Sequence, residues 1–313
     1  MKKVLFTVLT LALLATGSFA EAKKLTIGFA QLGAESGWRD AETESVKAAA
    51  AERGIDLKFS DAQQKQENQI KAIRSFIAQK VSGILLAPVV ETGWEPVLKE
   101  AKKAGIPVVL LDRNIKVSDP SLYTTFIGSN FILEGQRVAQ WVAKKTGGKA
   151  NIVELQGTVG ASAAIDRQKG FTDEVAKYPG LKIIKSQSGD FNRAGGKQVM
   201  EAFLKSDGDK INVVYAHNDD MAIGAIQAIE AAGKVPGKDI IVVSIDGVHD
   251  GFQALIDGKI SYIVECNPLL GNKGFDAIAK AVIGETLPKW TVQDDGAFDS
   301  AAAADAGIAS RKY

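Results

Sequence analysis

Short apolar runs alternate with longer amphipathic segments from Leu25 onward, and this alternation limits the fold more than any other feature of the sequence. The apolar runs are continuous, as is typical of strands buried on both faces: Leu25–Ala30, Ile84–Ala87, Val108–Leu111, Ile152–Leu155, Val213–Ala216, Ile241–Ile245 and Tyr262–Glu265. Segments with helical periodicity lie between them: Trp38–Arg53, Asn68–Gln79, Glu95–Ala104, Leu133–Lys145 and Met221–Ala232. This order predicts an α/β fold in which helices cover parallel sheets.

The strand-helix series starts again near Asn151, after a break at Gly147-Gly148. A chain of 313 residues is long enough for two domains that each bury a core. Since no low-complexity linker separates the two halves, close-packed crossing segments are expected to join them. We therefore expect two similar lobes.

The first 20 residues have the pattern of a signal peptide. Lys2 and Lys3 precede an apolar run over residues 4–15, and small residues follow at Ser18 and Ala20. A single membrane anchor is the alternative, but the run is shorter than the roughly 20 residues that cross a bilayer. We expect cleavage after Ala20 and an exported, soluble protein.

The cysteine content indicates the cellular compartment of the protein, and the charge content limits its possible partners. Cys266 is the only cysteine, so an intramolecular disulfide is not possible, and no cysteine near Ala20 offers a site for lipid attachment. Lys and Arg total 38 against 37 for Asp and Glu, a balance without the basic excess of nucleic-acid binding. The sequence fits a free periplasmic protein with no nucleic-acid partner.

Polar and aromatic residues follow several predicted strands. Ligands of open parallel sheets bind outside the carboxyl ends of the strands, so these residues are candidates for a binding site: Glu35, Ser36, Gly37, Trp38, Arg39, Asp112 and Arg113 in the first half, and Arg167, Phe191, Asn218 and Asp246 in the second. Carboxylates, amides and the planar fork of arginine suit sugar hydroxyls, and an aromatic ring can cover the apolar face of a sugar. We expect both halves to close over a small carbohydrate.

A structural role is the alternative for several of these residues. Asp112-Arg113 can form a local ion pair, and Asp246 precedes a glycine and suits a turn. Trp38 can pack against the sheet, and Asn218 can cap a helix. Asp219-Asp220 fit the first turn of that helix better than a metal site.

Catalytic motifs are not found. His217 and His249, the two histidines, lie outside any metal-binding spacing, and Cys266 lacks a local nucleophile motif, which favours a buried inert thiol. The Gly-Gly-Lys segments lack the phosphate-loop spacing, and the first strand is not followed by a dinucleotide motif. Glu35 and Asp112 can form an acid-base pair only if the fold brings them together. We expect no enzyme, catalytic residue, metal or cofactor.

Longer segments resemble the periplasmic binding proteins of the ribose and galactose type, over nearly all of the mature chain. Among members of that family, the segments are most similar to the galactofuranose binders. The segments are residues 35–39, 61–69, 92–96, 110–113, 154–162, 165–167, 186–191 and 217–221. Within the last, Asn218-Asp219 followed by Met221 marks the wider family.

The resemblance implies two flavodoxin-like lobes with parallel sheets, a three-segment hinge and a ligand in the cleft between them. The expected N-terminal lobe comprises residues 21–128 and 268–292, and the C-terminal lobe residues 129–267 and 293–313. The family pattern places Trp38, Arg39, Asp112 and Arg113 on one side of the ligand, and Arg167, Asn218 and Asp246 on the other. Glu35 lies in a loop that resembles the one in the galactofuranose binders, which implies that Glu35 also contacts the ligand. Asn267 matches a hinge position of the family.

The resemblance also implies a function: a monomeric receptor that binds a monosaccharide, galactofuranose above others, and delivers it to an ABC permease in the inner membrane. One alternative is that the ligand is another pentose or hexose. The other is that the protein presents its closed form to a chemoreceptor. A sugar-responsive repressor shares the fold but needs an N-terminal DNA-binding helix pair, where this chain has its export signal. A periplasmic sugar hydrolase is the enzyme alternative.

Overall fold

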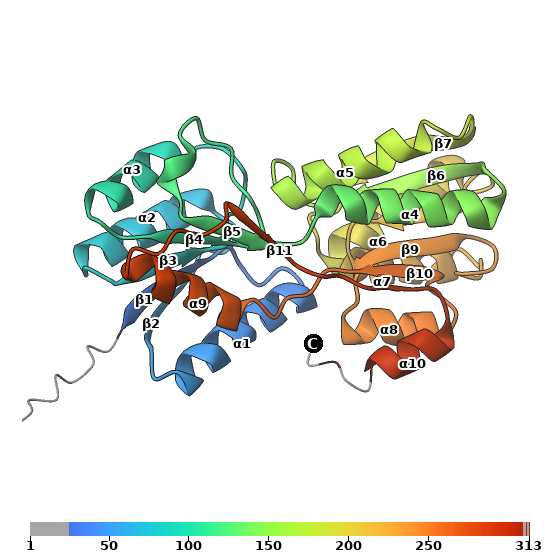
Figure 1. Ribbon diagram of the computed structural model, residues 1–313. Coiled ribbons are helices and arrows are strands. Elements are labelled where there is room, and N and C mark those ends of the chain that lie inside the picture. Colours follow the sequence, from blue (N-terminus) through green and yellow to red (C-terminus); the bar gives the residue numbers. More distant parts are fainter. Residues whose placement is uncertain (1–24, 309–310, 312) are drawn as a thin grey trace, which may run out of the picture.

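The computed structural model describes residues 25–308, 311 and 313. The predicted signal peptide and its cleavage point after Ala20 lie outside these residues. Two lobes lie side by side, each built on a six-stranded sheet, with connecting segments between them (Figure 1). The predicted two-lobed α/β fold is confirmed.

The first lobe contains a parallel sheet with the strand order β11-β5-β4-β3-β1-β2. Its strands are β1 (Thr26–Gln31), β2 (Asp56–Asp61), β3 (Gly83–Leu86), β4 (Val108–Leu111), β5 (Thr125–Gly128) and β11 (Trp290–Val292). Helices α1 (Gly37–Glu52) and α9 (Gly271–Val282) cover one side of the sheet. Helices α2 (Gln66–Ala78) and α3 (Glu95–Lys103) cover the other, and a short 3-10 turn spans Pro120–Leu122.

The second lobe repeats this plan with the strand order β12-β10-β9-β8-β6-β7. All neighbours are parallel except β12, which is antiparallel to β10. The strands are β6 (Lys149–Gln156), β7 (Gly180–Ser188), β8 (Val213–Ala216), β9 (Ile241–Asp246), β10 (Tyr262–Glu265) and β12 (Ala297–Phe298). The helices are α4 (Phe131–Thr146), α5 (Ser162–Val175), α6 (Arg193–Asp207), α7 (Asp219–Ala231), α8 (His249–Ile256) and α10 (Ala301–Ile308).

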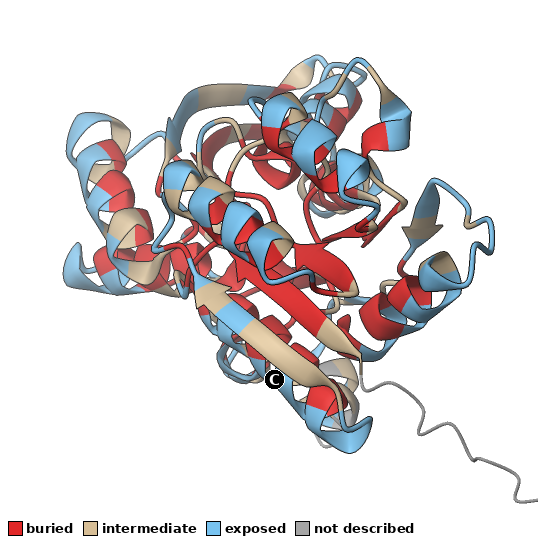
Figure 2. Ribbon diagram, turned by 90° about the vertical axis from the view of Figure 1, so that its left-hand side faces the viewer, coloured by how far each residue is buried: buried red, intermediate tan, exposed pale blue. Residues whose placement is uncertain are grey.

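The central strands are buried because their side chains are apolar on both faces. Every residue of β3, β4 and β8 is buried, and Figure 2 shows buried strands within a shell of helices whose outer faces are exposed. Full burial of one Val, Leu or Ile side chain contributes about 1.5–3 kcal/mol, so these strands hold each sheet rigid. Rigid sheets fix the positions of the residues that follow their carboxyl ends.

The chain crosses between the lobes three times: between β5 and α4, between β10 and α9, and between β11 and β12. The crossing segments are bonded to one another. Ser129 Oγ lies 3.4 Å from Cys266 Sγ, and Asn267 N donates to Asp295 Oδ1 at 3.1 Å. These contacts form a compact hinge, as the absence of a low-complexity linker predicts.

Candidate functional site

A cavity lies between the lobes, at the carboxyl ends of the strands. Its wall contains ten of the residues proposed from the sequence: Glu35, Ser36, Trp38, Arg39, Asp112, Arg113, Arg167, Phe191, Asn218 and Asp246. Ala163 and Cys266 complete the lining. The structure therefore brings together residues that are far apart in the sequence.

Two residues proposed from the sequence lie outside the lining. Gly37 has no side chain, and its backbone N–H donates to Asp220 Oδ2 at 2.9 Å. Asn267 uses its side chain within the hinge, because its Oδ1 accepts from Leu269 N at 2.9 Å. We therefore assign Gly37 to contact between the lobes and Asn267 to the hinge.

In the first lobe, Arg39 lies at the centre of a buried cluster of carboxylates. Its Nη2 donates to Asp112 Oδ2 at 2.6 Å and its Nε to Glu35 Oε1 at 3.2 Å, while Nη1 binds Glu42. Burial opposes the charge, but the surrounding carboxylates, Glu42 first, raise the pKa of Arg39 well above its usual value. This network fixes Arg39 and Asp112 against the cavity.

Arg113 is less completely paired. Its Nη1 donates to Val89 O at 3.0 Å, and its Nη2 lies 3.4 Å from Glu35 Oε1. Burial, and then the nearby charge of Arg39, lower the pKa of Arg113 to about 10. Arg113 Nε and Glu35 Oε2 are buried without a hydrogen-bond partner among the described residues. Because such groups are costly unless a partner satisfies them, this donor and this acceptor are available to a polar ligand.

The second lobe contributes Arg167, Asn218 and Asp246. Arg167 Nη1 donates to His217 O at 2.7 Å, and its Nη2 lies 3.6 Å from Asp246 Oδ1. Burial raises the pKa of Asp246 well above its usual value, although Arg167 acts in the opposite direction. Asn218 caps α7 by accepting from Met221 N at 3.0 Å, so the capping role considered from the sequence is confirmed for a residue that also lines the cavity.

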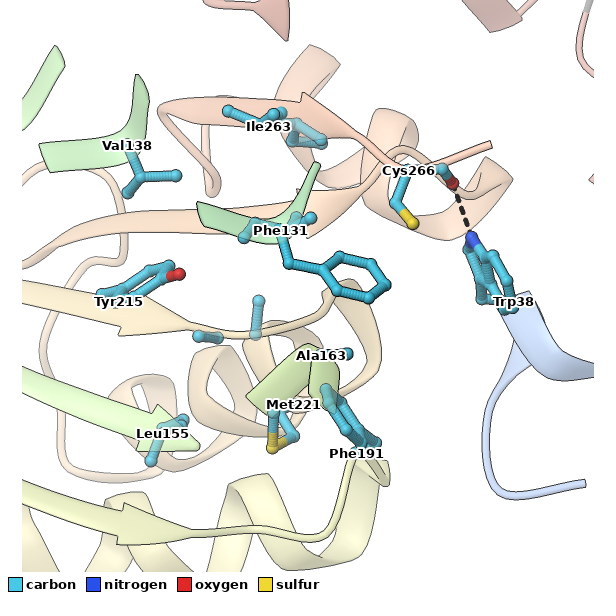
Figure 3. Close-up of a cluster of buried hydrophobic side chains, with 14 of the residues drawn as sticks. Trp38, Phe131, Val138, Leu155, Ala163, Phe191, Tyr215, Met221, Ile263 and Cys266 are labelled. Carbon is cyan, nitrogen blue, oxygen red and sulfur yellow. Dashed lines mark hydrogen bonds between the residues drawn. The ribbon is translucent and has the colours of Figure 1, made fainter. Parts of the chain in front are cut away.

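Aromatic rings limit the cavity on both sides. Phe191 lies beneath the Arg113 guanidinium, with 5.1 Å from its ring centroid to Arg113 Cζ. Figure 3 shows Trp38 approaching from α1, opposite Phe131 and Phe191 of the second lobe. The indole N–H of Trp38 donates to Cys266 O at 2.5 Å, which fixes the ring at the cavity wall. Aromatic faces and charged forks together suit the C–H and O–H groups of a polyol.

Three lining residues have a left-handed backbone, with φ of 60° at Asp112, 59° at Phe191 and 121° at Asp246. A residue other than glycine in such a conformation costs on the order of 1–3 kcal/mol. Asp112 and Asp246 occupy matching positions at the carboxyl ends of β4 and β9. Strain at equivalent places in the two lobes supports a functional role for both aspartates.

Direct hydrogen bonds between the lobes show that the molecule is closed. Asn114 N donates to Ser162 Oγ at 2.9 Å and Glu91 N to Gly160 O at 2.9 Å, in addition to the Gly37–Asp220 bond. All of the charged lining residues except Glu35 are among the buried side chains of the whole molecule, and the side chain of Glu35 is only 2% exposed. A solute in the cavity is therefore enclosed.

Two lobes that close over a polar cavity define a class of protein that traps a small solute. The family model described as "Periplasmic binding protein domain" matches residues 27–286. The chain belongs to this family.

Several relatives have long matches. The galactofuranose-binding protein YtfQ of Escherichia coli (strain K12) is 57% identical over 278 residues, which cover 88% of this chain and 87% of the relative. A periplasmic binding protein of an arabinose ABC transporter from Shewanella sp. ANA-3, bound to α- and β-L-arabinofuranose, is 55% identical with a TM-score of 0.89; the match covers 92% of this chain and 95% of that one. A structure from Mycobacterium smegmatis in complex with β-D-fucofuranose is 57% identical with a TM-score of 0.90, again over 92% and 95%.

Proposed function

We propose that the protein binds one monosaccharide in its furanose form, galactofuranose above others, and delivers it unchanged to an ABC permease of the inner membrane. The observation that carries this proposal is the closed polar cavity, where a buried donor of Arg113 and a buried acceptor of Glu35 have no hydrogen-bond partner among the described residues.

The similar proteins support the furanose ring. Their names or titles mention galactofuranose, L-arabinofuranose and β-D-fucofuranose, at 55–57% identity to this chain. L-Arabinofuranose is the second candidate ligand, because the arabinose-transporter component covers 92% of this chain at a TM-score of 0.89. We infer that the residues lining the cavity, including Asp112 and Arg167, bind the sugar hydroxyls.

We also propose that the protein is a periplasmic monomer, released by cleavage after Ala20. Among the helices within residues 25–308, none is long and apolar enough to cross a membrane. The lobe boundaries that we propose are residues 21–128 with 268–292, and residues 129–267 with 293–313. The crossing segments at Ser129, Asn267 and Asp295 support these boundaries.

Calorimetric titration of the mature, ligand-stripped protein tests the ligand. Galactose in solution is an equilibrium of ring forms, so when injections are faster than interconversion of the rings, selection of the minor furanose form gives tight binding with an equivalence point at an excess of total sugar over protein. Arabinose, ribose and glucose serve as comparison sugars. An equivalence point at one total galactose per protein, or a preference for ribose or glucose, would reject galactofuranose as the ligand, and no binding to any of the four sugars would reject the carbohydrate. Recovery of the sugar unchanged after incubation would support a receptor that performs no chemistry.

A further inference from the structure

Glu134 is a buried carboxylate behind the cavity, in the first turn of α4 and directly after the first crossing segment. Its Oε2 accepts from Arg167 Nε at 2.7 Å. Its Oε1 is buried and has no hydrogen-bond partner among the described residues. Glu134 is not among the residues that line the cavity, so its effect on a bound sugar has to pass through Arg167.

The contacts of Arg167 fix which edge of its guanidinium faces the cavity. Nε donates to Glu134 and Nη1 to His217 O at 2.7 Å, while the Phe131 ring centroid lies 5.0 Å from Cζ. Nη2 remains, 3.6 Å from Asp246 Oδ1 and therefore beyond normal hydrogen-bond length. This edge is free to donate to a sugar hydroxyl as long as Glu134 holds the opposite edge.

We propose that Glu134 is a positioning residue for Arg167 and that sugar affinity depends on the ionisation of its carboxyl group. This inference rests on the proposed function. Ionised Glu134 holds Nε through a charge-assisted bond, which is roughly twice as strong as a neutral one. When Glu134 is protonated, Arg167 loses the opposite charge that holds Nε, and the guanidinium is held less firmly in the orientation that presents Nη2 to the sugar.

Titratable groups from several elements surround Glu134. Arg167 of α5, Cys266 after β10 and Asp295 between β11 and β12 act on it directly, and it acts in turn on Tyr215 of β8 and Asp246 of β9. Burial raises the pKa of Glu134 to about 7, although Arg167 opposes the shift. Glu134 is therefore ionised above about pH 7, and affinity falls as the pH decreases through that value. The pKa values of Asp246 and Asp295 are also raised, so a variant of Glu134 is needed to separate its contribution.

Calorimetric titration with D-galactose at pH 8, 7 and 6 tests the inference in the wild type and Glu134→Gln. If only the ionised form binds, affinity of the wild type falls about tenfold from pH 8 to pH 6, because the competent fraction falls by that factor. Glu134→Gln should bind more weakly than the wild type at pH 8 and show no such dependence. Any effect of pH on the ring forms of galactose occurs equally in both proteins.

Asp219 is the rival source of a pH effect, since burial raises its pKa to about 7 as well. It binds Gly247 N and Val248 N rather than Arg167. Asp219→Asn should therefore keep the tenfold dependence. Persistence of the dependence in Glu134→Gln, or its loss in Asp219→Asn alone, would overturn the proposal.

A second measurement does not need the sugar. In the sugar-free mature protein, the ¹⁵N resonance of Arg167 Nε, assigned by its absence in Arg167→Lys, should move with a midpoint near pH 7 and stay constant in Glu134→Gln. If no sugar binds, the proposed function fails, while this resonance still decides whether Glu134 controls Arg167. A wild-type resonance that does not move between pH 6 and 8 contradicts the inference even if galactose binds.

Discussion

Asp112, at the end of β4, lines the cavity and also pairs with the buried charged cluster around Arg39. Its Oδ2 accepts from Arg39 at 2.6 Å, and its backbone is left-handed. Arg39 also contacts Glu35 and Glu42, so the arginine keeps counter-charges if Asp112 loses its own. A neutral residue of the same shape therefore tests binding with little change in the fold.

We expect Asp112→Asn to weaken sugar binding by about 10- to 150-fold, because a hydrogen bond to a charged group contributes roughly 1.5–3 kcal/mol. Calorimetry gives the affinity, and thermal unfolding should show a midpoint close to that of the wild type. Asp276→Asn is the matched control: this exposed residue of α9 pairs with Arg53 on the surface. Wild-type affinity in Asp112→Asn would remove Asp112 from the site.

Lining residues that directly follow a strand could be identified from the sequence. The buried residues that hold those side chains in place could not. Asp112, Arg113 and Asp246 come after continuous apolar runs, and the strand-end rule places them at one edge of the sheet. The same rule applies to Cys266 after β10, which the sequence interpretation treated only as an inert thiol. Glu134 looks like an ordinary residue of a helix first turn, because only tertiary packing shows that it faces Arg167.

At the scale of elements, the N-terminus of α7 forms a hydrogen bond with the other lobe. Asp220, in its first turn, accepts from Gly37 N of α1 and also binds Arg193. The sequence interpretation assigned Asp219-Asp220 to the first turn of a helix, which is confirmed, but did not foresee the bond between the lobes.

Asp220→Ala should weaken sugar affinity by about tenfold, mainly through faster release, because the closed state loses a charge-assisted bond between the lobes. Stopped-flow measurement of release gives the rate. Asp250→Ala is the control, since Asp250 also pairs with Arg193 but lies exposed in the second lobe. Equal release rates in the two variants would show that the Gly37–Asp220 bond does not stabilise closure.

Buried strands were predictable as elements, and edge strands were not. β4, β8 and β10 begin and end at the predicted residues, since their apolar runs are short and continuous. β2 and β7 lie at the sheet edges, and their polar, partly exposed sequences lack such runs. β11 and β12 are two to three residues long, so pairing with β5 and β10 determines them rather than local sequence.

At the scale of the whole molecule, buried acids make stability depend on pH. Burial raises the pKa of Glu134 and of Asp219 to about 7, whereas carboxyl groups of an unfolded chain have pKa values near 4. Between these values the folded protein binds more protons than the unfolded chain, so stability increases as the pH falls from 8. Burial lowers the pKa of His217, which opposes this trend below about pH 6.5.

Urea unfolding should therefore give a free energy of unfolding that is higher at pH 6.5 than at pH 8, by about 1 kcal/mol for each of the two acids. In Glu134→Gln the difference should decrease, since one of the acids with a raised pKa is removed. A wild-type stability that falls over this interval would contradict the assignment of two buried acids with raised pKa values.

The central claim is that the closed cavity holds a sugar in its furanose form. The most direct measurement is the ¹³C NMR spectrum of uniformly labelled galactose in complex with the mature protein. The account predicts that the bound sugar gives furanose ring signals, and that these signals are weaker with Asp112→Asn at the same concentrations. Bound signals from the pyranose ring alone would contradict it.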